Sequence, residues 1–238
     1  MGSVYLLTLR QLSGKWRLAI MAVLATLPVI ITVVMLSQRD TGTSVTEFEI
    51  FVISAMLSGS IAPLAVLAIA AAAFGNEVED RTLANLTISP VPRWQIALPK
   101  LLATITVAAP FIAASAGLTA HVAFLADARA TIAVTIAAIV GVAMYASAFV
   151  WLGLVSTQAI GIGLLYIVLW EGFFSGFVSG VRLLSIRYYA IALMHGLDAR
   201  RFAASDHPGL AAAIALSVVV TVGFLFLAIR RLKRMDVP

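Results

Sequence analysis

The stretch Ala130–Trp170 constrains this chain more than any other feature, because its 41 consecutive residues include no Asp, Glu, Lys or Arg. As one α-helix it would be about 60 Å long, roughly twice the thickness of the hydrocarbon core of a bilayer. The stretch therefore predicts two membrane-crossing helices that fold back on each other. Glycine and small polar residues gather at 153–163, so we expect a tight uncharged turn between spans near 130–153 and 159–179.

Four further uncharged runs are long enough to cross a membrane on their own, since a crossing helix needs about 20 apolar residues. They are Leu18–Leu36, Phe51–Phe74, Leu101–Leu125 and Gly209–Ile229. We expect the corresponding spans at approximately 17–37, 50–75, 97–124 and 209–230. The sequence thus predicts an all-α, polytopic membrane protein with six transmembrane helices in a single domain, 1–238.

The composition favours a lipid environment over water. Hydrophobic residues make up 62% of the chain and charged residues 11%, against about 25% charged in an average soluble domain. A soluble chain of this size could not cover so much apolar surface with polar groups. The net charge of +5 would suggest a nucleic-acid partner for a soluble chain. Here the basic residues stand mostly at the ends of apolar runs, so we expect the lipid bilayer as partner and no nucleic acid.

The distribution of basic residues predicts the orientation. If both termini are cytoplasmic, the inner segments carry ten Lys and Arg residues and the outer segments carry six. The inner ones are Arg10, Lys15, Arg17, Arg81, Arg93, Lys100, Arg230, Arg231, Lys233 and Arg234, and the outer ones are Arg39, Arg129, Arg182, Arg187, Arg200 and Arg201. Positive charge concentrates on the cytoplasmic side of membrane proteins. We therefore expect a multi-pass protein of the inner or plasma membrane with both termini in the cytoplasm.

Two partly apolar segments flank the spans. Residues 4–12 place apolar side chains around most of a helix, which favours an interfacial N-terminal helix that turns into the first span. The alternative is that this helix merely extends that span. The segment 180–208 is too polar to cross the membrane and too apolar to be a free loop, because aliphatic and tyrosine side chains alternate loosely with arginines. We expect short helices at the outer leaflet there, between spans five and six.

The cytoplasmic loop at 76–96 differs from the rest of the chain. Three carboxylates, Glu77, Glu79 and Asp80, fall within four residues where span two leaves the membrane. A short apolar run of helical period follows, and Pro90 and Pro92 stop it, because proline fixes φ and cannot donate a backbone hydrogen bond. These features predict a short helix on the membrane surface and a stiff turn. From the residues alone, an ordinary polar loop with interfacial anchors is the default interpretation.

This loop resembles that of the type-2 permeases of ABC exporters. In that family an acidic residue precedes Gly-Thr-Leu, and a leucine pair, Pro-Val-Ser-Arg and Gly-Lys follow. The matching residues here are Glu77 or Glu79, Thr82, Leu83, Leu86, Pro90, Val91, Arg93 and Lys100. Arg81 and Pro99 stand where the family usually has glycine, and Pro92 stands where serine is common. The expected topology of the whole chain is also similar to that of the family.

The resemblance implies a transport subunit without chemistry of its own. Two such permease subunits, identical or related, would enclose a path at their interface, and a cytoplasmic ABC ATPase would dock on the loop. The ATPase-coupling residues that it implies are Glu77, Glu79, Asp80, Arg81, Thr82, Leu83, Leu86, Pro90 and Arg93. The chain has no Gly-x-x-x-x-Gly-Lys-Ser/Thr stretch, so ATP and magnesium would be bound by the partner. We expect no cofactor and no catalytic residue in this chain.

Glu171 is the one carboxylate in the body of an expected span. An ionised carboxylate facing lipid is costly, so Glu171 should face a bundle interior, a subunit interface or water. Two interpretations stay open: a cargo contact or gate, and a structural carboxylate paired with Arg182 or Arg187. Span four carries a stripe of large side chains that favours helix packing first and a translocation path second. The candidate path residues are Glu171, Met144, Tyr145 and Phe149.

Two other functions are weighed against the exporter. The segment His195-Gly196-Leu197-Asp198-Ala199-Arg200 is superficially similar to the start of the motif of phospholipid head-group transferases, but the order differs and the later aspartates are missing. An intramembrane lipid-modifying enzyme stays an alternative. No metal site is expected in it, because the three histidines lie far apart in the sequence and His-Glu-x-x-His is absent. The other alternative is a secondary transporter, but such proteins usually carry several intramembrane charges, whereas this chain offers one in the body of its expected spans. The uncharged spans favour an amphipathic or lipid-like cargo, and small peptides, antibiotics and glycan lipids stay open as alternatives.

Overall fold

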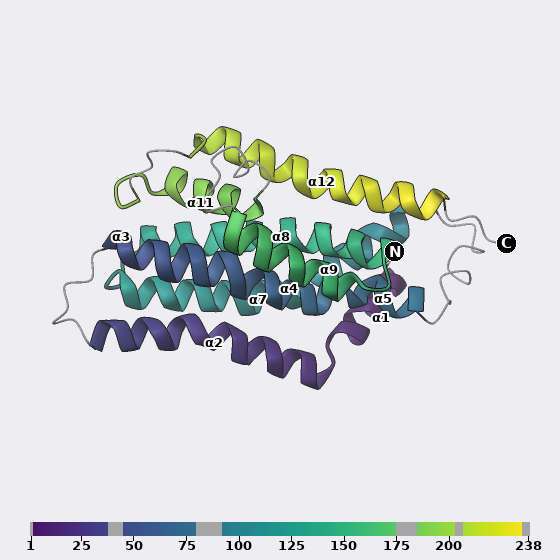
Figure 1. Ribbon diagram of the computed structural model, residues 1–238, viewed down its shortest axis with the longest axis horizontal. Coiled ribbons are helices and arrows are strands. Elements are labelled where there is room, and N and C mark those ends of the chain that lie inside the picture. Colours follow the sequence, from purple (N-terminus) through teal and green to yellow (C-terminus); the bar gives the residue numbers. More distant parts are fainter. Residues whose placement is uncertain (1, 38–44, 80–91, 175–184, 203–206, 235–238) are drawn as a thin grey trace.

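The computed structural model describes residues 2–37, 45–79, 92–174, 185–202 and 207–234, and these ranges contain helices and no strand (Figure 1). The all-α prediction is therefore confirmed for the part of the chain that the structure describes. Five segments are long and apolar enough to cross a membrane: Lys15–Ser37, Thr46–Gly75, Trp94–Ala123, Ala128–Val155 and Leu210–Arg234. They correspond to the expected spans one, two, three, four and six.

The first, third, fourth and sixth of the expected spans are single helices: α2 (Lys15–Ser37), α7 (Trp94–Ala123), α8 (Ala128–Val155) and α12 (Leu210–Arg234). The second span is a series of helical segments: α3 (Val45–Phe48), η2 (Glu49–Ile61), α4 (Ala62–Ala70) and α5 (Ala72–Glu79). The η2 segment is a π-helix, in which the Ala62 amide donates to the carbonyl of Leu57, five residues earlier.

The expected fifth span, 159–179, is described only in part. The segments α9 (Ala159–Leu165) and η3 (Tyr166–Phe174), the latter again π-helical, form an apolar helix shorter than a span. Residues 175–184 lie outside the described part of the chain. The count of six spans therefore stays a prediction.

The expected uncharged turn lies between α8 and α9 and is confirmed. The amide of Ser156 donates to the carbonyl of Leu152 at 3.0 Å, and the hydroxyl of Ser156 accepts from the amide of Gln158 at 3.1 Å. Gly153 brings α8 against the second span: a Cβ added there would lie 2.6 Å from the carbonyl oxygen of Ala71. A larger residue cannot fit against that backbone, so glycine sets how closely the two helices approach.

The N-terminal segment is a helix of its own. Helix α1 (Gly2–Leu12) ends before Ser13 and Gly14, and α2 begins at Lys15. It packs against α7, where the hydroxyl of Tyr5 donates to that of Thr106 at 3.0 Å. The alternative of a simple extension of span one is thus wrong, while the position of α1 at the membrane interface stays a prediction.

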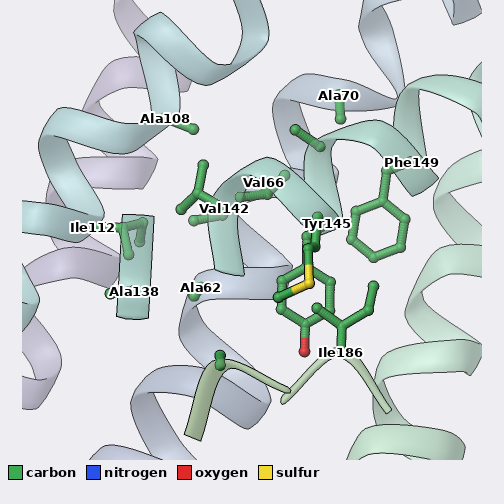
Figure 2. Packing of buried hydrophobic residues seen from close by; sticks show 14 of the residues in the cluster. Ala62, Val66, Ala70, Ala108, Ile112, Ala138, Val142, Tyr145, Phe149 and Ile186 are labelled. Carbon is green, nitrogen blue, oxygen red and sulfur yellow. The ribbon is translucent and has the colours of Figure 1, made fainter. Parts of the chain in front are cut away.

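Helix α8 lies at the centre of the bundle, in contact with α4, α5, α7, α11 (Ile186–Leu197) and α12. Figure 2 shows this packing, with Val66 of α4, Ile112 of α7 and Ile186 of α11 facing Val142 and Tyr145 of α8. Helices α2 and α12 lie on opposite flanks of the bundle (Figure 1). Helix formation in the segment 180–208 is confirmed for 186–197. Most of α11 is buried against α8 and α12, and its expected place at the outer leaflet stays a prediction.

Candidate functional site

The expected coupling loop is described only at its two ends. Glu77 and Glu79 lie in the last turns of α5, and Arg93 directly precedes α7. The other predicted coupling residues fall outside the described part of the chain; they are Asp80, Arg81, Thr82, Leu83, Leu86 and Pro90. The short surface helix predicted for this loop is therefore untested.

Lys100 joins the two ends of this loop inside the bundle. Its side chain is 1% exposed, its ammonium donates to the carbonyl of Ala73 in α5, and it stands 4.5 Å from the centre of the Phe74 ring. A buried ammonium must find such partners, because an uncompensated charge in an apolar interior is costly. Lys100 thus fixes the start of α7 to the end of the second span. The sequence signalled this residue only through its place in the family motif.

Glu171 is fully buried and accepts hydrogen bonds from two hydroxyl groups and two backbone amides, among other contacts. The hydroxyl of Tyr166 donates at 2.9 Å, that of Ser185 at 2.5 Å, the amide of Ile186 at 2.9 Å and the amide of Arg187 at 3.5 Å. Ser185 also caps α11, since its hydroxyl oxygen accepts from the amide of Tyr188 at 3.2 Å. A carboxylate at a helix N-terminus satisfies unpaired amides and complements the helix dipole. The geometry therefore favours the structural interpretation of Glu171: it attaches η3 to the start of α11.

The start of α11 also contacts the second span. The side chain of Arg187 lies over Gly59 of η2, where an added Cβ would be 2.8 Å from the guanidinium nitrogen Nη1. Gly59 therefore makes room for Arg187. Of the two predicted partners of Glu171, Arg187 donates through its backbone, and Arg182 lies outside the described residues.

The stripe on span four packs between the second and fifth spans. Met144, Tyr145 and Phe149 are at most 2% exposed. The Tyr145 hydroxyl donates to the carbonyl of Ser58 at 3.4 Å, and its ring stacks on Phe149 at 5.9 Å between centroids (Figure 2). Phe149 in turn meets the edge of Tyr166 at 6.3 Å. Packing accounts for all three side chains, and their role in a path stays a prediction.

A cavity of about 510 Å³ opens beside Phe149, between α8, α9, η3, α11 and α12. Its walls carry aromatic and aliphatic side chains, among them Phe149, Trp151, Tyr166, Tyr189 and Phe224. A cavity of this size and lining suits the apolar part of a small molecule. The sequence pointed to Phe149 on span four but not to the α11 and α12 walls, because nothing in the pattern of 180–208 places α11 inside the bundle.

The comparison with protein families identifies the class of the chain. Residues 12–189 of the 238 match the family described as ABC-2 family transporter protein. The chain therefore belongs to the ABC-2 transporter family, and the resemblance drawn from the loop is confirmed at this level. No curated protein matches the chain. Family membership makes it a membrane transport component rather than a catalytic subunit, and implies an ABC ATPase as its partner.

Proposed function

We propose that this chain is the membrane-spanning permease subunit of an ATP-driven ABC exporter, with six spans and both termini in the cytoplasm. The family match over 12–189 carries the proposal, and the five helices of spanning length support it. The neighbouring elements support a sixth crossing. Helix α1 and the end of α12 lie at the same end of the bundle, and this supports an even number of crossings (Figure 1). Segments α9 and η3 would form the described part of this remaining crossing, which is the fifth in chain order.

Single cysteines test this topology, because the chain has none of its own. A membrane-impermeant maleimide added to intact cells should label Asp127→Cys and Arg200→Cys, and also Asp40→Cys, which lies outside the described residues. Arg93→Cys and Gln158→Cys should react only after the membrane is permeabilised. Labelling of Arg200→Cys from the cytoplasmic side alone would overturn the six-span arrangement.

We propose further that the segment 77–93 docks the ATPase. Lys100 supports this, because it holds the start of α7 against α5 and so gives the loop a rigid base. Movement of a docked partner would then pass into spans two and three together. The carboxylates Glu77, Glu79 and Asp80 would meet basic residues of the partner, and pairing at a desolvated interface matters more than at an open surface.

Charge reversal tests the docking proposal. The double variant Glu77→Lys/Glu79→Lys should lose ATPase co-purification, or should hydrolyse ATP without transport. Its membrane insertion should survive, because added positive charge on the inner side agrees with the orientation rule. The matched control is Thr157→Lys/Gln158→Lys, which adds lysines at the exposed α8–α9 turn on the same predicted face. If the Glu77→Lys/Glu79→Lys variant assembles and transports normally, the loop only connects two spans and the docking proposal is contradicted.

A second permease subunit belongs to the proposal, because one set of six spans is too small to enclose a path for an amphipathic molecule. If the two subunits are identical, two copies carrying different affinity tags should co-purify with the ATPase. If they differ, one tagged copy should co-purify with the ATPase and with a closely related permease chain. An active complex that contains a single permease chain would contradict this part of the proposal.

The proposed cargo is amphipathic or lipid-like, and the apolar cavity beside Phe149 supports this. Met144, Tyr145 and Glu171 remain proposed path residues, and all three are buried in the described state. A series of alkyl glycosides of increasing chain length should stimulate ATP hydrolysis by the complex, and Phe149→Trp should weaken that stimulation by filling the cavity. Phe226→Trp is the control, since Phe226 of α12 is 60% exposed. Equal effects of the two variants would exclude the cavity as a cargo site.

A further inference from the structure

The end of α12 carries exposed cations that the described part of the chain does not neutralise. They are Arg230, Arg231, Lys233 and Arg234. None of the four forms an ion pair with another described residue. The carboxylates whose side chains the structure describes lie elsewhere, since Glu171 is buried inside the bundle and the others lie towards its opposite end (Figure 1). Those others are Glu47, Glu49, Asp127 and Asp198.

Two general effects place cations at such a helix end without making a binding site. Positive charge concentrates on the cytoplasmic side of membrane proteins. The carbonyl end of a helix also carries about half a negative elementary charge, which a nearby cation complements. Neither effect depends on the side of the helix on which the cations stand. The side of α12 that they occupy therefore distinguishes a binding site from these effects.

Helical periodicity aligns three of the four cations with residues that line the cavity beside Phe149. The aligned pairs are Arg230 with Val219, 11 residues apart, Arg231 with Phe224, seven apart, and Arg234 with Leu216, 18 apart. These separations are close to three, two and five turns of an α-helix. Lys233 instead aligns with Val222, which is 55% exposed and does not line this cavity. We call Arg230, Arg231 and Arg234 the cavity-side arginines.

The cavity-side arginines stand at the depth of a lipid headgroup whose acyl chain fills the cavity. Arg231 lies 11 residues beyond Val220, which lines the cavity. Along the helix axis this separation is about 16 Å. The hydrocarbon of one leaflet is about 15 Å thick, half of the bilayer core. An acyl chain of ordinary length that reaches Val220 would therefore end in a headgroup beside the arginines.

The cavity of about 510 Å³ is open to the bilayer between α9 and α12. Two of its lining residues form this rim, because Ile162 of α9 is 44% exposed and Val219 of α12 is 64% exposed. Trp151 of α8 contacts Phe224 at 5.6 Å between ring centroids, which brings the end of α8 beside the basic end of α12. The α8–α9 turn that follows is polar and exposed at 157–158 and carries no charge. It can donate hydrogen bonds to a headgroup without repelling an anion.

We propose that this cavity and the cavity-side arginines form one binding site for an anionic phospholipid of the adjoining leaflet. An acyl chain lies in the cavity, and the phosphate lies against the guanidinium groups, which bind phosphate oxygens through paired hydrogen bonds. The proposed topology makes this the inner leaflet. Because the cavity is also the proposed cargo site, the inference names the charge of its occupant. It rests on the proposed function only for the statement that this occupant is exported.

Trp151 can report on the site, because it lines the cavity. Replacement of Trp16, Trp94 and Trp170 by phenylalanine leaves Trp151 as the single tryptophan of the chain. In phosphatidylcholine bilayers, brominated phosphatidylglycerol and brominated phosphatidylcholine should both quench its fluorescence. The quenching curves should give a preference for phosphatidylglycerol of roughly tenfold, since each cation near the membrane surface favours an anionic lipid by a factor of about five before screening.

Charge removal on the two sides of α12 separates the site from general surface attraction. The triple variant Arg230→Gln/Arg231→Gln/Arg234→Gln should lose the preference. The matched control is Arg10→Gln/Lys15→Gln/Lys233→Gln, which removes three exposed cations from the same end of the bundle and should keep it. Equal losses in the two triple variants, or a parent chain without the preference, overturn the site.

Native mass spectrometry provides a second measurement that needs no tryptophan substitution. After extraction from a mixture of the two unbrominated lipids, the wild type and the control variant should retain phosphatidylglycerol, and the cavity-side triple variant should not. A wild type that retains the two lipids equally overturns the site even if the single-tryptophan chain fails to fold.

The complex with its ATPase tests whether this lipid is also cargo. A larger share of phosphatidylglycerol in the bilayer should speed ATP hydrolysis by a factor of several for the wild type and the control, and should leave the cavity-side triple variant unchanged. Selective binding without stimulation supports the site and overturns its occupant as cargo, because the lipid is then a resident one. Failure of the chain to associate with any ABC ATPase contradicts the proposed function instead, and the quenching result still decides the site.

Discussion

Helices α8 and α12 lie side by side and are both apolar over a full membrane span, yet they occupy opposite environments. In the most apolar window of α8, 61% of the residues are buried, against 17% in the corresponding window of α12. The most apolar window of α12 is nevertheless more hydrophobic than that of α8. In a membrane, therefore, hydrophobicity shows that a helix crosses but does not show whether it faces protein or lipid, because lipid is as apolar as leucine.

Small residues distinguish the two helices better than hydropathy does. Gly153 of α8 faces the backbone of Ala71, which lies between α4 and α5. Gly141 of α8 faces the side chain of Ala190 in α11. Gly223 of α12 has no neighbour within 4 Å of the position that a Cβ would take. Close contact between membrane helices depends on such packing rather than on exclusion of water. The difference between α8 and α12 can be tested by substitutions of the same kind on each.

The largest effect is expected for Gly153→Ala. The added methyl group would lie 2.6 Å from the carbonyl oxygen of Ala71 and 3.3 Å from its carbonyl carbon and Cα, so two helix backbones would have to separate. Overpacking of this kind costs about 1–3 kcal/mol, and more where backbone is involved. We expect a melting temperature several degrees lower or loss of the folded chain, measured by thermal unfolding in detergent.

Gly223→Ala is its matched control on α12. The new methyl group would enter open space, and alanine is favoured over glycine in a helix by about 0.5–1 kcal/mol. We expect unchanged or slightly raised stability. Equal destabilisation by both substitutions would show that the contrast between α8 and α12 does not govern packing.

The next largest effect is expected for Glu171→Ala, because α11 packs against both α8 and α12 and begins at this carboxylate. Removal of the side chain leaves the hydroxyls of Tyr166 and Ser185 and the amide of Ile186 without their acceptor. A buried polar group left unpaired costs about 1–3 kcal/mol. The chain should unfold several degrees earlier. Glu171→Gln keeps one oxygen acceptor, so its unfolding temperature should lie between those of the alanine variant and the wild type. Its assembly should stay intact, and any functional change should be in transport. Wild-type stability of the alanine variant would contradict the capping role.

The sequence predicted the spans from their length and lack of charge, and it located the α8–α9 turn from the small residues at 153–163. It could not predict that α11 packs inside the bundle. Arg187 was expected in an outer segment or beside Glu171, and no pattern in the sequence shows that Gly59 of η2 leaves space for its side chain. Glu171 was recognised as unusual from its position in a span. Its role depended on the amide of Ile186, a backbone group that no side-chain pattern reveals. The contact between Glu49 of η2 and His195 of α11 joins residues 146 positions apart, beyond the reach of local motifs.

A smaller effect is expected at the start of α8, where Asp127 accepts from the amides of Arg129 and Ala130 and from Arg201. The hydrogen bond from Arg201, followed by that from the Ala130 amide, holds the pKa of Asp127 below its usual value. A lowered pKa in the folded state stabilises the chain above the ordinary aspartate range, near pH 4, and this contribution is lost as the pH falls through the folded-state value.

Asp127→Asn should therefore lower the melting temperature slightly at neutral pH and flatten its decline in acid. The effect is small because the side chain is 37% exposed and open to screening. Asparagine can still cap the helix, whereas Asp127→Ala removes both the cap and the ion pair and should unfold earlier than Asp127→Asn. If the melting temperature of Asp127→Asn falls more steeply with decreasing pH than that of the wild type, a lowered pKa of Asp127 is contradicted.

The smallest effect is expected for Phe226→Leu on α12. Phe226 is 60% exposed, so in the bilayer its ring meets lipid, and leucine meets lipid equally well. Substitutions away from packed sites usually change stability by less than about 0.5 kcal/mol. Phe149→Leu on α8 is the matched change at a 2% exposed position, where lost packing should cost on the order of 1–2 kcal/mol. Thermal unfolding of the isolated chain should separate the two variants clearly. Phe226→Leu could also leave the isolated chain stable and yet destabilise the complex with a second permease subunit. In that case this face of α12 contacts protein in the assembly, and Phe226 is exposed only in the single chain.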